Sequence, residues 1–133
     1  MYLSLGSNLG DKESHLREAT EKIGELIGAV VRQSTLYYSE PWGFESDNGF
    51  VNAVVLCLTP LSPRRLLRAT QRIERLMGRT EKSVGGVYHD RVIDIDILLY
   101  DDLHIDYPDL KIPHPLMHQR DFVMVPLREV MAD

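Results

Sequence analysis

The stretch Arg91-Val92-Ile93-Asp94-Ile95-Asp96-Ile97-Leu98-Leu99-Tyr100 predicts a β-strand, because it is rich in β-branched and apolar residues and has no Gly or Pro. Side chains of a strand alternate between its two faces. We therefore expect a buried face that carries Ile93, Ile95, Ile97 and Leu99. The opposite face is expected to carry the two carboxylates, Asp94 and Asp96, together with Val92, Leu98 and Tyr100.

The two carboxylates of this strand are the first candidate site. Their Cα atoms should lie about 6.5–7 Å apart, so the charges repel each other on an otherwise apolar strand and call for a compensating cation. Carboxylate oxygens are hard ligands, and Mg²⁺ usually takes one or two of them together with substrate phosphates. The alternative is a solvated Asp-x-Asp on an open sheet face.

Length and composition indicate a globular protein, and we expect one domain over residues 1–133. The formal net charge of −5 gives no bulk attraction to nucleic acid or to a membrane surface. The single cysteine, Cys57, lies in an apolar run and is expected to be an inert core thiol. Met1–Gly6 lacks the basic and apolar regions of a signal peptide, and no apolar run approaches a membrane span. The expected compartment is the cytoplasm.

The order of predicted elements indicates the fold class. Strands are expected over residues 1–5, 30–38, 50–59 and 91–100. Helices are expected over residues 11–27 and from Ser62-Pro63 to Gly78, on the basis of helical apolar spacing, a capping serine and terminal glycines. This order predicts an α+β, ferredoxin-like βαββαβ core, with an antiparallel sheet, helices on one face and an active site on the other. The C-terminal extras should include a short strand over 123–125 and a helical turn over 126–131.

Two predicted loops are candidates for the site, and the first carries an aromatic residue that a merely solvated loop rarely needs. The loop over 39–49 contains Trp42 beside Gly43. The loop over 79–90 contains Arg79, Lys82 and two adjacent glycines and leads into Arg91. Loops of this length in a compact domain are usually functional or disordered, and we expect the second one to act as a lid.

Several motifs, taken in chain order, resemble the 6-hydroxymethyl-7,8-dihydropterin pyrophosphokinase family over nearly the whole chain. The most specific is Arg-x-x-Asp-x-Asp over 91–96. The others are Gly6-Ser7-Asn8-Leu9-Gly10, Trp42-Gly43, Phe50-Val51-Asn52, Gln71-Arg72-Ile73-Glu74, Gly78-Arg79, Pro113-His114 and Arg120-Asp121-Phe122. The resemblance implies an ATP-dependent enzyme of folate biosynthesis that transfers the β,γ-pyrophosphate of ATP to the pterin hydroxymethyl group and releases AMP.

The resemblance also implies a role for each site residue. The catalytic residues would be Arg79, Arg91, Asp94 and Asp96, with Asp94 and Asp96 as ligands of two Mg²⁺ ions. Contacts to ATP would come from Gln71, Glu74, Arg79, Lys82, Arg91, Ile97, His114 and Arg120. The pterin would be bound by Trp42, Gly43, Phe50, Asn52, Asp94 and Phe122, with the two phenylalanines stacking on it and the Asn52 amide reading its polar edge.

The chain departs from the family pattern at Val87-Tyr88-His89-Asp90, just before Arg91, and at Asp109-Leu110-Lys111. Two other functions stay open from the residues alone. A non-catalytic ligand-binding module would explain the sheet, although not paired carboxylates beside loop arginines. A metal-dependent phosphodiesterase would explain the carboxylates, although it usually needs more metal ligands to activate water.

Overall fold

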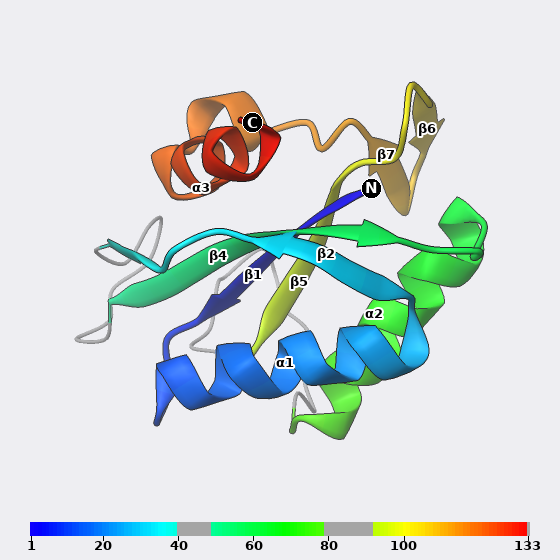
Figure 1. The fold of residues 1–133 in the computed structure, drawn as a ribbon. Coiled ribbons are helices and arrows are strands. Elements are labelled where there is room, and N and C mark those ends of the chain that lie inside the picture. The colour runs from blue at the N-terminus through cyan, green and yellow to red at the C-terminus, as the bar shows by residue number, and fades with distance from the viewer. Residues whose placement is uncertain (40–48, 79–91, 133) are drawn as a thin grey trace.

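A five-stranded antiparallel sheet is the centre of the computed structural model, which describes residues 1–39, 49–78 and 92–132 (Figure 1). The strand order is β2-β4-β1-β5, and β3 pairs with β4. The predicted ferredoxin-like arrangement is confirmed, and the predicted strand over 30–38 is divided into two. The strands are β1 (Tyr2–Ser7), β2 (Ala29–Gln33), β3 (Tyr37–Ser39), β4 (Phe50–Leu58) and β5 (Asp94–Leu99).

Helices α1 (Lys12–Leu26) and α2 (Pro63–Leu76) cover one face of the sheet, as predicted (Figure 1). Each begins at a residue whose side chain accepts a hydrogen bond from a backbone N–H of the first turn, Asp11 for α1 and Ser62 for α2. Their apolar stripes form the larger hydrophobic core against the sheet. Its fully buried members include Leu16, Ile23, Leu66 and Ile73.

Strand β5 has the predicted alternation only from Ile93 to Ile97, and Val92, expected on the carboxylate face, packs against the core of the isoleucines. Ile93, Ile95 and Ile97 are buried in the core beneath α1 and α2, and Asp94 and Asp96 lie on the opposite face, half-buried. The register then shifts, because Ile97 pairs with Leu3 whereas Leu99 pairs with Tyr2. This irregularity places Leu99 on the carboxylate face of the sheet and Tyr100 against the core beneath α1 and α2. Both positions are the reverse of the prediction.

Helix α3 (Asp121–Met131) covers part of the carboxylate face of the sheet (Figure 1). The short strand predicted over 123–125 is wrong, because these residues lie within this helix. Apolar residues of α3 follow helical spacing and form a second core with Val54 and Leu98 of the sheet. These residues of α3 are Val123, Leu127 and Val130. The sheet therefore lies between two cores.

The segment between β5 and α3 contains a hairpin that the sequence analysis did not predict. Its strands are β6 (Ile105–Tyr107) and β7 (Leu110–Ile112), and a 3-10 turn over Met117–Gln119 follows. Arg64 of α2 pairs with Asp109 at the hairpin turn and lies over the ring of Tyr107, 5.4 Å from its centroid. The hairpin is thereby attached to the start of α2. Within the described part of the chain, no helix is long and apolar enough to cross a membrane.

Candidate active site

One row of residues crosses three strands on the carboxylate face of the sheet. Gly6 of β1 lies opposite Asp94 of β5 on one side and opposite Asn52 of β4 on the other. A Cβ atom at Gly6 would lie 2.5 Å from Asn52 Oδ1, so the glycine gives the amide its room. Asn52 is 4% exposed, and its Nδ2 donor has no hydrogen-bond partner within the described residues. In this row the backbone of Gly6, which carries no side chain, therefore lies between a buried amide donor, Asn52, and a carboxylate, Asp94.

The two predicted stacking residues lie on this same side of the sheet. Phe50 is two residues before Asn52 and is half-buried, and its ring lies 3.7 Å from the position of a Gly6 Cβ. Phe122 is in the first turn of α3 and packs against the second core. The guanidinium carbon of Arg120 lies 5.6 Å from the centroid of the Phe122 ring, a cation–π contact. Arg120 and Phe122 therefore form one unit at the start of α3.

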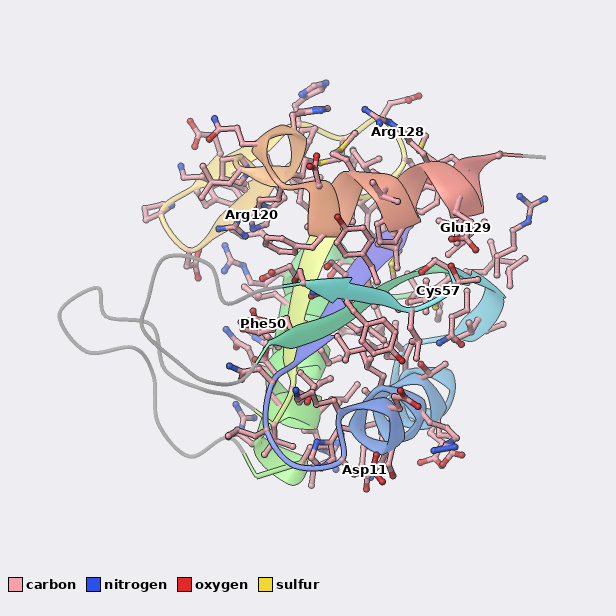
Figure 2. All side chains as sticks on the ribbon, turned by 90° about the vertical axis from the view of Figure 1, so that its left-hand side faces the viewer. Asp11, Phe50, Cys57, Arg120, Arg128 and Glu129 are labelled. Carbon is pink, nitrogen blue, oxygen red and sulfur yellow. The ribbon has the colours of Figure 1, made fainter. Side chains whose placement is uncertain are left out.

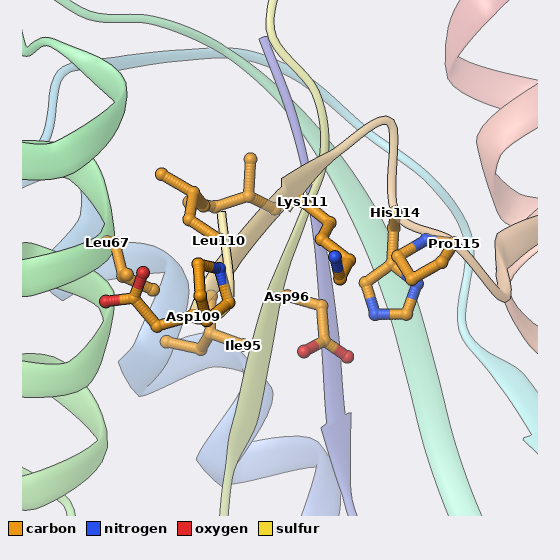
Figure 3. Close-up of a pocket in the computed structure, with 10 residues that line it drawn as sticks. Leu67, Ile95, Asp96, Asp109, Leu110, Lys111, His114 and Pro115 are labelled. Carbon is orange, nitrogen blue, oxygen red and sulfur yellow. The ribbon is translucent and has the colours of Figure 1, made fainter. Parts of the chain in front are cut away.

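A cavity of about 430 Å³ lies between α2, β5 and the segment that leads into α3. Six predicted site residues line it, namely Gln71, Glu74, Asp94, Asp96, His114 and Arg120. A second cavity of about 250 Å³ shares Asp96 and His114 and extends along Ile97 to the β6–β7 hairpin. In Figure 3, Asp96, Lys111 and His114 come together on one side of this second cavity, with Leu67 and Asp109 on the other. We call these two adjoining cavities the α2–β5 cleft.

His114 is held firmly at the edge of both cavities. Its backbone N–H donates to Leu98 O at 3.0 Å, and its Nδ1 accepts from the backbone N–H of Leu116 at 3.3 Å. In the neutral ring the proton is therefore on Nε2. Burial, followed by the nearby Arg120 charge, lowers the pKa of His114, and Asp94 opposes this shift. The ring is thus a neutral donor through Nε2, and a bound anion would raise its pKa.

Glu74 is a buried carboxylate on α2, with 6% of its surface exposed. Its Oε2 accepts a hydrogen bond of 2.9 Å from the backbone N–H of Ile95, the residue between the two aspartates. A buried carboxylate is stable only where donors satisfy it. This contact, which the sequence alone does not predict, joins the helix to the edge of the sheet.

The chemistry of the donors fits Mg²⁺. Asp94 and Asp96 are half-buried carboxylates on one face of one strand. Among residues 1–39, 49–78 and 92–132 there is no cluster of three or more His, Cys, Asp or Glu side chains suited to a metal ion. A pair of carboxylates without a closed protein cage is the arrangement that Mg²⁺ uses when substrate phosphates complete its coordination.

Five predicted site residues, Trp42, Gly43, Arg79, Lys82 and Arg91, lie outside the described residues, as does the predicted lid. The structure also adds a residue that the sequence analysis missed. The predicted strand ends at residue 5, but Gly6 lies within β1 and shapes the row of Asn52 and Asp94. A single glycine inside a strand often marks a close approach, and this signal could have identified it.

The family model described as 7,8-dihydro-6-hydroxymethylpterin-pyrophosphokinase matches residues 2–132 of this chain. The chain belongs to this family. Among curated relatives, the 2-amino-4-hydroxy-6-hydroxymethyldihydropteridine pyrophosphokinase of Porphyromonas gingivalis is 53% identical over 131 residues, which cover 98% of this chain and 89% of the relative. The enzyme of the same name from Aquifex aeolicus is 43% identical, with 98% and 79% covered.

The fold of this pyrophosphokinase also resembles that of a solved structure. A crystal structure described as HPPK-DHPS in complex with substrates matches with a TM-score of 0.76 and covers 98% of this chain and 39% of the other. Its 14% identity supports the fold alone.

Membership of the family confirms the predicted activity. The enzyme transfers pyrophosphate from ATP to 6-hydroxymethyl-7,8-dihydropterin in folate biosynthesis, giving the pterin diphosphate and AMP. ATP and the pterin are therefore its substrates. Neither alternative, the non-catalytic binding module or the phosphodiesterase, receives support from the relatives.

Proposed function

We propose that the two substrates meet at Asp94, with ATP in the α2–β5 cleft and the pterin over the row of Gly6 and Asn52. The observation that carries this proposal is that Asp94 belongs both to that row and to the larger cavity, which it shares with His114 and Arg120. In this arrangement the pterin hydroxyl oxygen forms a bond to the β-phosphorus of ATP and releases its proton. The bond from that phosphorus to the α-phosphate oxygen breaks, and AMP leaves.

Asp94 and Asp96 would hold two Mg²⁺ ions. Bound there, Mg²⁺ would neutralise the phosphate oxygens and stabilise the charge on the leaving AMP. The carboxylates themselves would orient the ions from a strand whose other face is fixed in the core. In pyrophosphoryl transfer little covalent work falls to the protein, so positioning of this kind accounts for most of its contribution.

The remaining polar residues of the cleft would bind the nucleotide. Arg120 offers a planar fork of donors suited to phosphate oxygens, and His114 offers its Nε2–H. Gln71 lines the same cavity, and Ile97 lines the part that extends to the hairpin. Further phosphate contacts would come from the loop residues Arg79, Lys82 and Arg91.

The pterin would be held between aromatic faces and read by polar edges. Phe50 and Phe122 would supply the apolar faces, since both are partly buried on the side of the sheet that carries Asp94. The Asn52 Nδ2 donor, which is buried and has no partner among the described residues, would pair with an acceptor of the ring. Trp42 and Gly43 would complete this subsite from the loop over 39–49.

The test of the proposal is to replace each aspartate by asparagine, which keeps its size and removes one anionic oxygen. We expect Asp94→Asn and Asp96→Asn to lower the rate of AMP formation by at least about a hundredfold and to raise the Mg²⁺ concentration for half-maximal activity. Melting temperature should not fall, because removal of one of two like charges relieves repulsion.

Asp102→Asn, in an exposed turn after the same strand, is the matched control and should leave the rate unchanged. Turnover close to that of the unmodified enzyme at limiting Mg²⁺ in either aspartate variant would refute the metal site.

A further inference from the structure

The buried carboxylate of Glu74 contacts the strand of the aspartates through its backbone. The bond from Ile95 N–H to Glu74 Oε2 joins residues 21 positions apart and is fully buried. An ionised acceptor makes a shorter and stronger hydrogen bond than a neutral one. The carboxylate therefore fixes one point on β5, and that point lies between Asp94 and Asp96.

The position of β5 explains why this point needs to be fixed. Among the described residues, β5 ends the strand order of the sheet and pairs with β1 alone. In an antiparallel strand, successive residues direct their backbone amides to opposite edges. Since Ile95 donates to Glu74, its amide points away from β1, and the backbones of Asp94 and Asp96 face β1. Glu74 thus satisfies an edge amide for which β1 has no acceptor.

We propose that Glu74 is a positioning residue, which holds the backbone between Asp94 and Asp96 and so fixes the two carboxylates relative to the cleft. The inference rests on the proposed function of these carboxylates. It differs from the role that the family resemblance implies, which is contact with ATP. Glu74 lines the larger cavity, but its Oε2 is engaged by the Ile95 N–H, so the contact that the structure shows acts on the strand.

Two substitutions of Glu74 separate the hydrogen bond from the rest of the side chain. Glu74→Gln retains an oxygen that can accept from Ile95, and Glu74→Leu removes the acceptor at similar size. Glu25 is an exposed glutamate on α1, so Glu25→Gln and Glu25→Leu are matched controls for charge and helix propensity. Circular dichroism and thermal melting establish that each variant is folded.

The first measurement is amide hydrogen exchange at Ile95, followed by NMR in the free protein without nucleotide or metal. We expect faster exchange in Glu74→Leu, and exchange close to that of the unmodified protein in Glu74→Gln and in both controls. The second measurement is steady-state kinetics. In Glu74→Leu, kcat should fall about tenfold to a hundredfold, with KM for ATP and for the pterin within about twofold, and Gln should restore most of it.

Unchanged exchange at Ile95 in Glu74→Leu would overturn the proposal. A rise in KM for ATP with kcat intact would also overturn it and would favour direct contact with the nucleotide. If Glu74→Leu does not fold, Glu74→Gln decides, because lost turnover in that folded variant with unchanged Ile95 exchange would show that Glu74 acts by a route other than the hydrogen bond to Ile95. If Asp94→Asn and Asp96→Asn keep full activity while Ile95 exchange still depends on Glu74, the proposed function fails and the strand contact stands.

Discussion

At the scale of single residues, the site depends on the absence of a side chain at Gly6 as much as on the side chains of the residues around it. Gly6 has Asn52 on one side and Asp94 on the other, and an added Cβ would lie 2.5 Å from Asn52 Oδ1. Real contacts of a Cβ atom are never this short. Because Asn52 is buried, its amide can move only by giving up its present orientation.

We therefore predict that Gly6→Ala weakens pterin binding more than ATP binding. The added methyl group displaces the Asn52 amide, whereas the α2–β5 cleft is lined by other residues. Overpacking of this kind typically costs about 1–3 kcal/mol in stability, so the variant should still fold. Isothermal titration with each substrate measures the effect. Gly24→Ala, at a helical position with no atom within 4 Å of the added Cβ, is the control. Equal loss of affinity for both substrates would contradict the prediction.

His114 gives a prediction about pH, because burial lowers its pKa below the ordinary value of 6.5. As pH falls, the unfolded chain binds a proton at this residue before the folded protein does. The free energy of unfolding should therefore decrease as pH falls from 6.5 toward the lower pKa of the folded state. Urea unfolding at several pH values should show that His114→Asn removes this component, whereas His104→Asn, at an exposed position, leaves it. A component that survives in His114→Asn belongs to another group.

At the scale of elements, α3 carries site residues at its start and is attached to the sheet near its end. Its first turn and the residue before it supply Phe122 and Arg120 to the site, and Glu129 lies toward the opposite end of the helix (Figure 2). The Glu129 carboxylate accepts from the backbone N–H of Thr35 at 2.8 Å and from its hydroxyl at 2.9 Å. Arg32 donates to the carbonyl oxygens of Val130 and Ala132 near the C-terminal end. The connection between β2 and β3 thus sets the position of α3.

From this attachment we predict that Glu129→Ala loosens the far end of α3. Two hydrogen bonds are lost, at about 0.5–1.5 kcal/mol each, so the melting temperature should fall by a few degrees. The KM for the pterin should rise severalfold, because Phe122 is carried by the same helix, while the KM for ATP should change less. Arg128→Ala, at the neighbouring exposed position, is the control. No change in pterin KM would show that the second core alone positions the start of α3.

At the scale of the whole molecule, local patterns in the sequence were sufficient for the core of the fold. The apolar stripes, the capping Ser62 and the terminal glycines predicted α1 and α2 nearly to the residue. The alternation of β5 placed Asp94 and Asp96 on the face opposite the isoleucines. The predictions that failed concern segments whose secondary structure depends on tertiary contacts. Val123-Met124-Val125 has strand propensity, but its helical spacing with Leu127 and Val130 allows burial against the sheet.

Residue types and motifs were sufficient to predict most of the residues that line the candidate site. The paired carboxylates and the polar residues of the cleft follow from motifs, and the structure brings six of them to one cavity. The contact of Glu74 with Ile95 could not be predicted, because it depends on how α2 crosses the edge of the sheet. The irregularity near Leu98 could not be predicted either, because it depends on how β5 pairs with β1.

The two cores on opposite faces of the sheet lead to a final prediction. Leu66 of α2 and Leu127 of α3 are both fully buried leucines, one in each core. Replacing either by alanine leaves a cavity and should lower the free energy of unfolding by about 2–5 kcal/mol. Among the described residues, only the second core includes side chains of the helix that carries Phe122. Leu127→Ala should therefore also weaken pterin binding. The pterin affinity of Leu66→Ala, once corrected for the fraction of unfolded protein, should equal that of the unmodified enzyme. Urea unfolding and isothermal titration on both variants measure the two effects. Equal pterin affinities in the two folded variants would show that packing beneath α3 does not affect pterin binding.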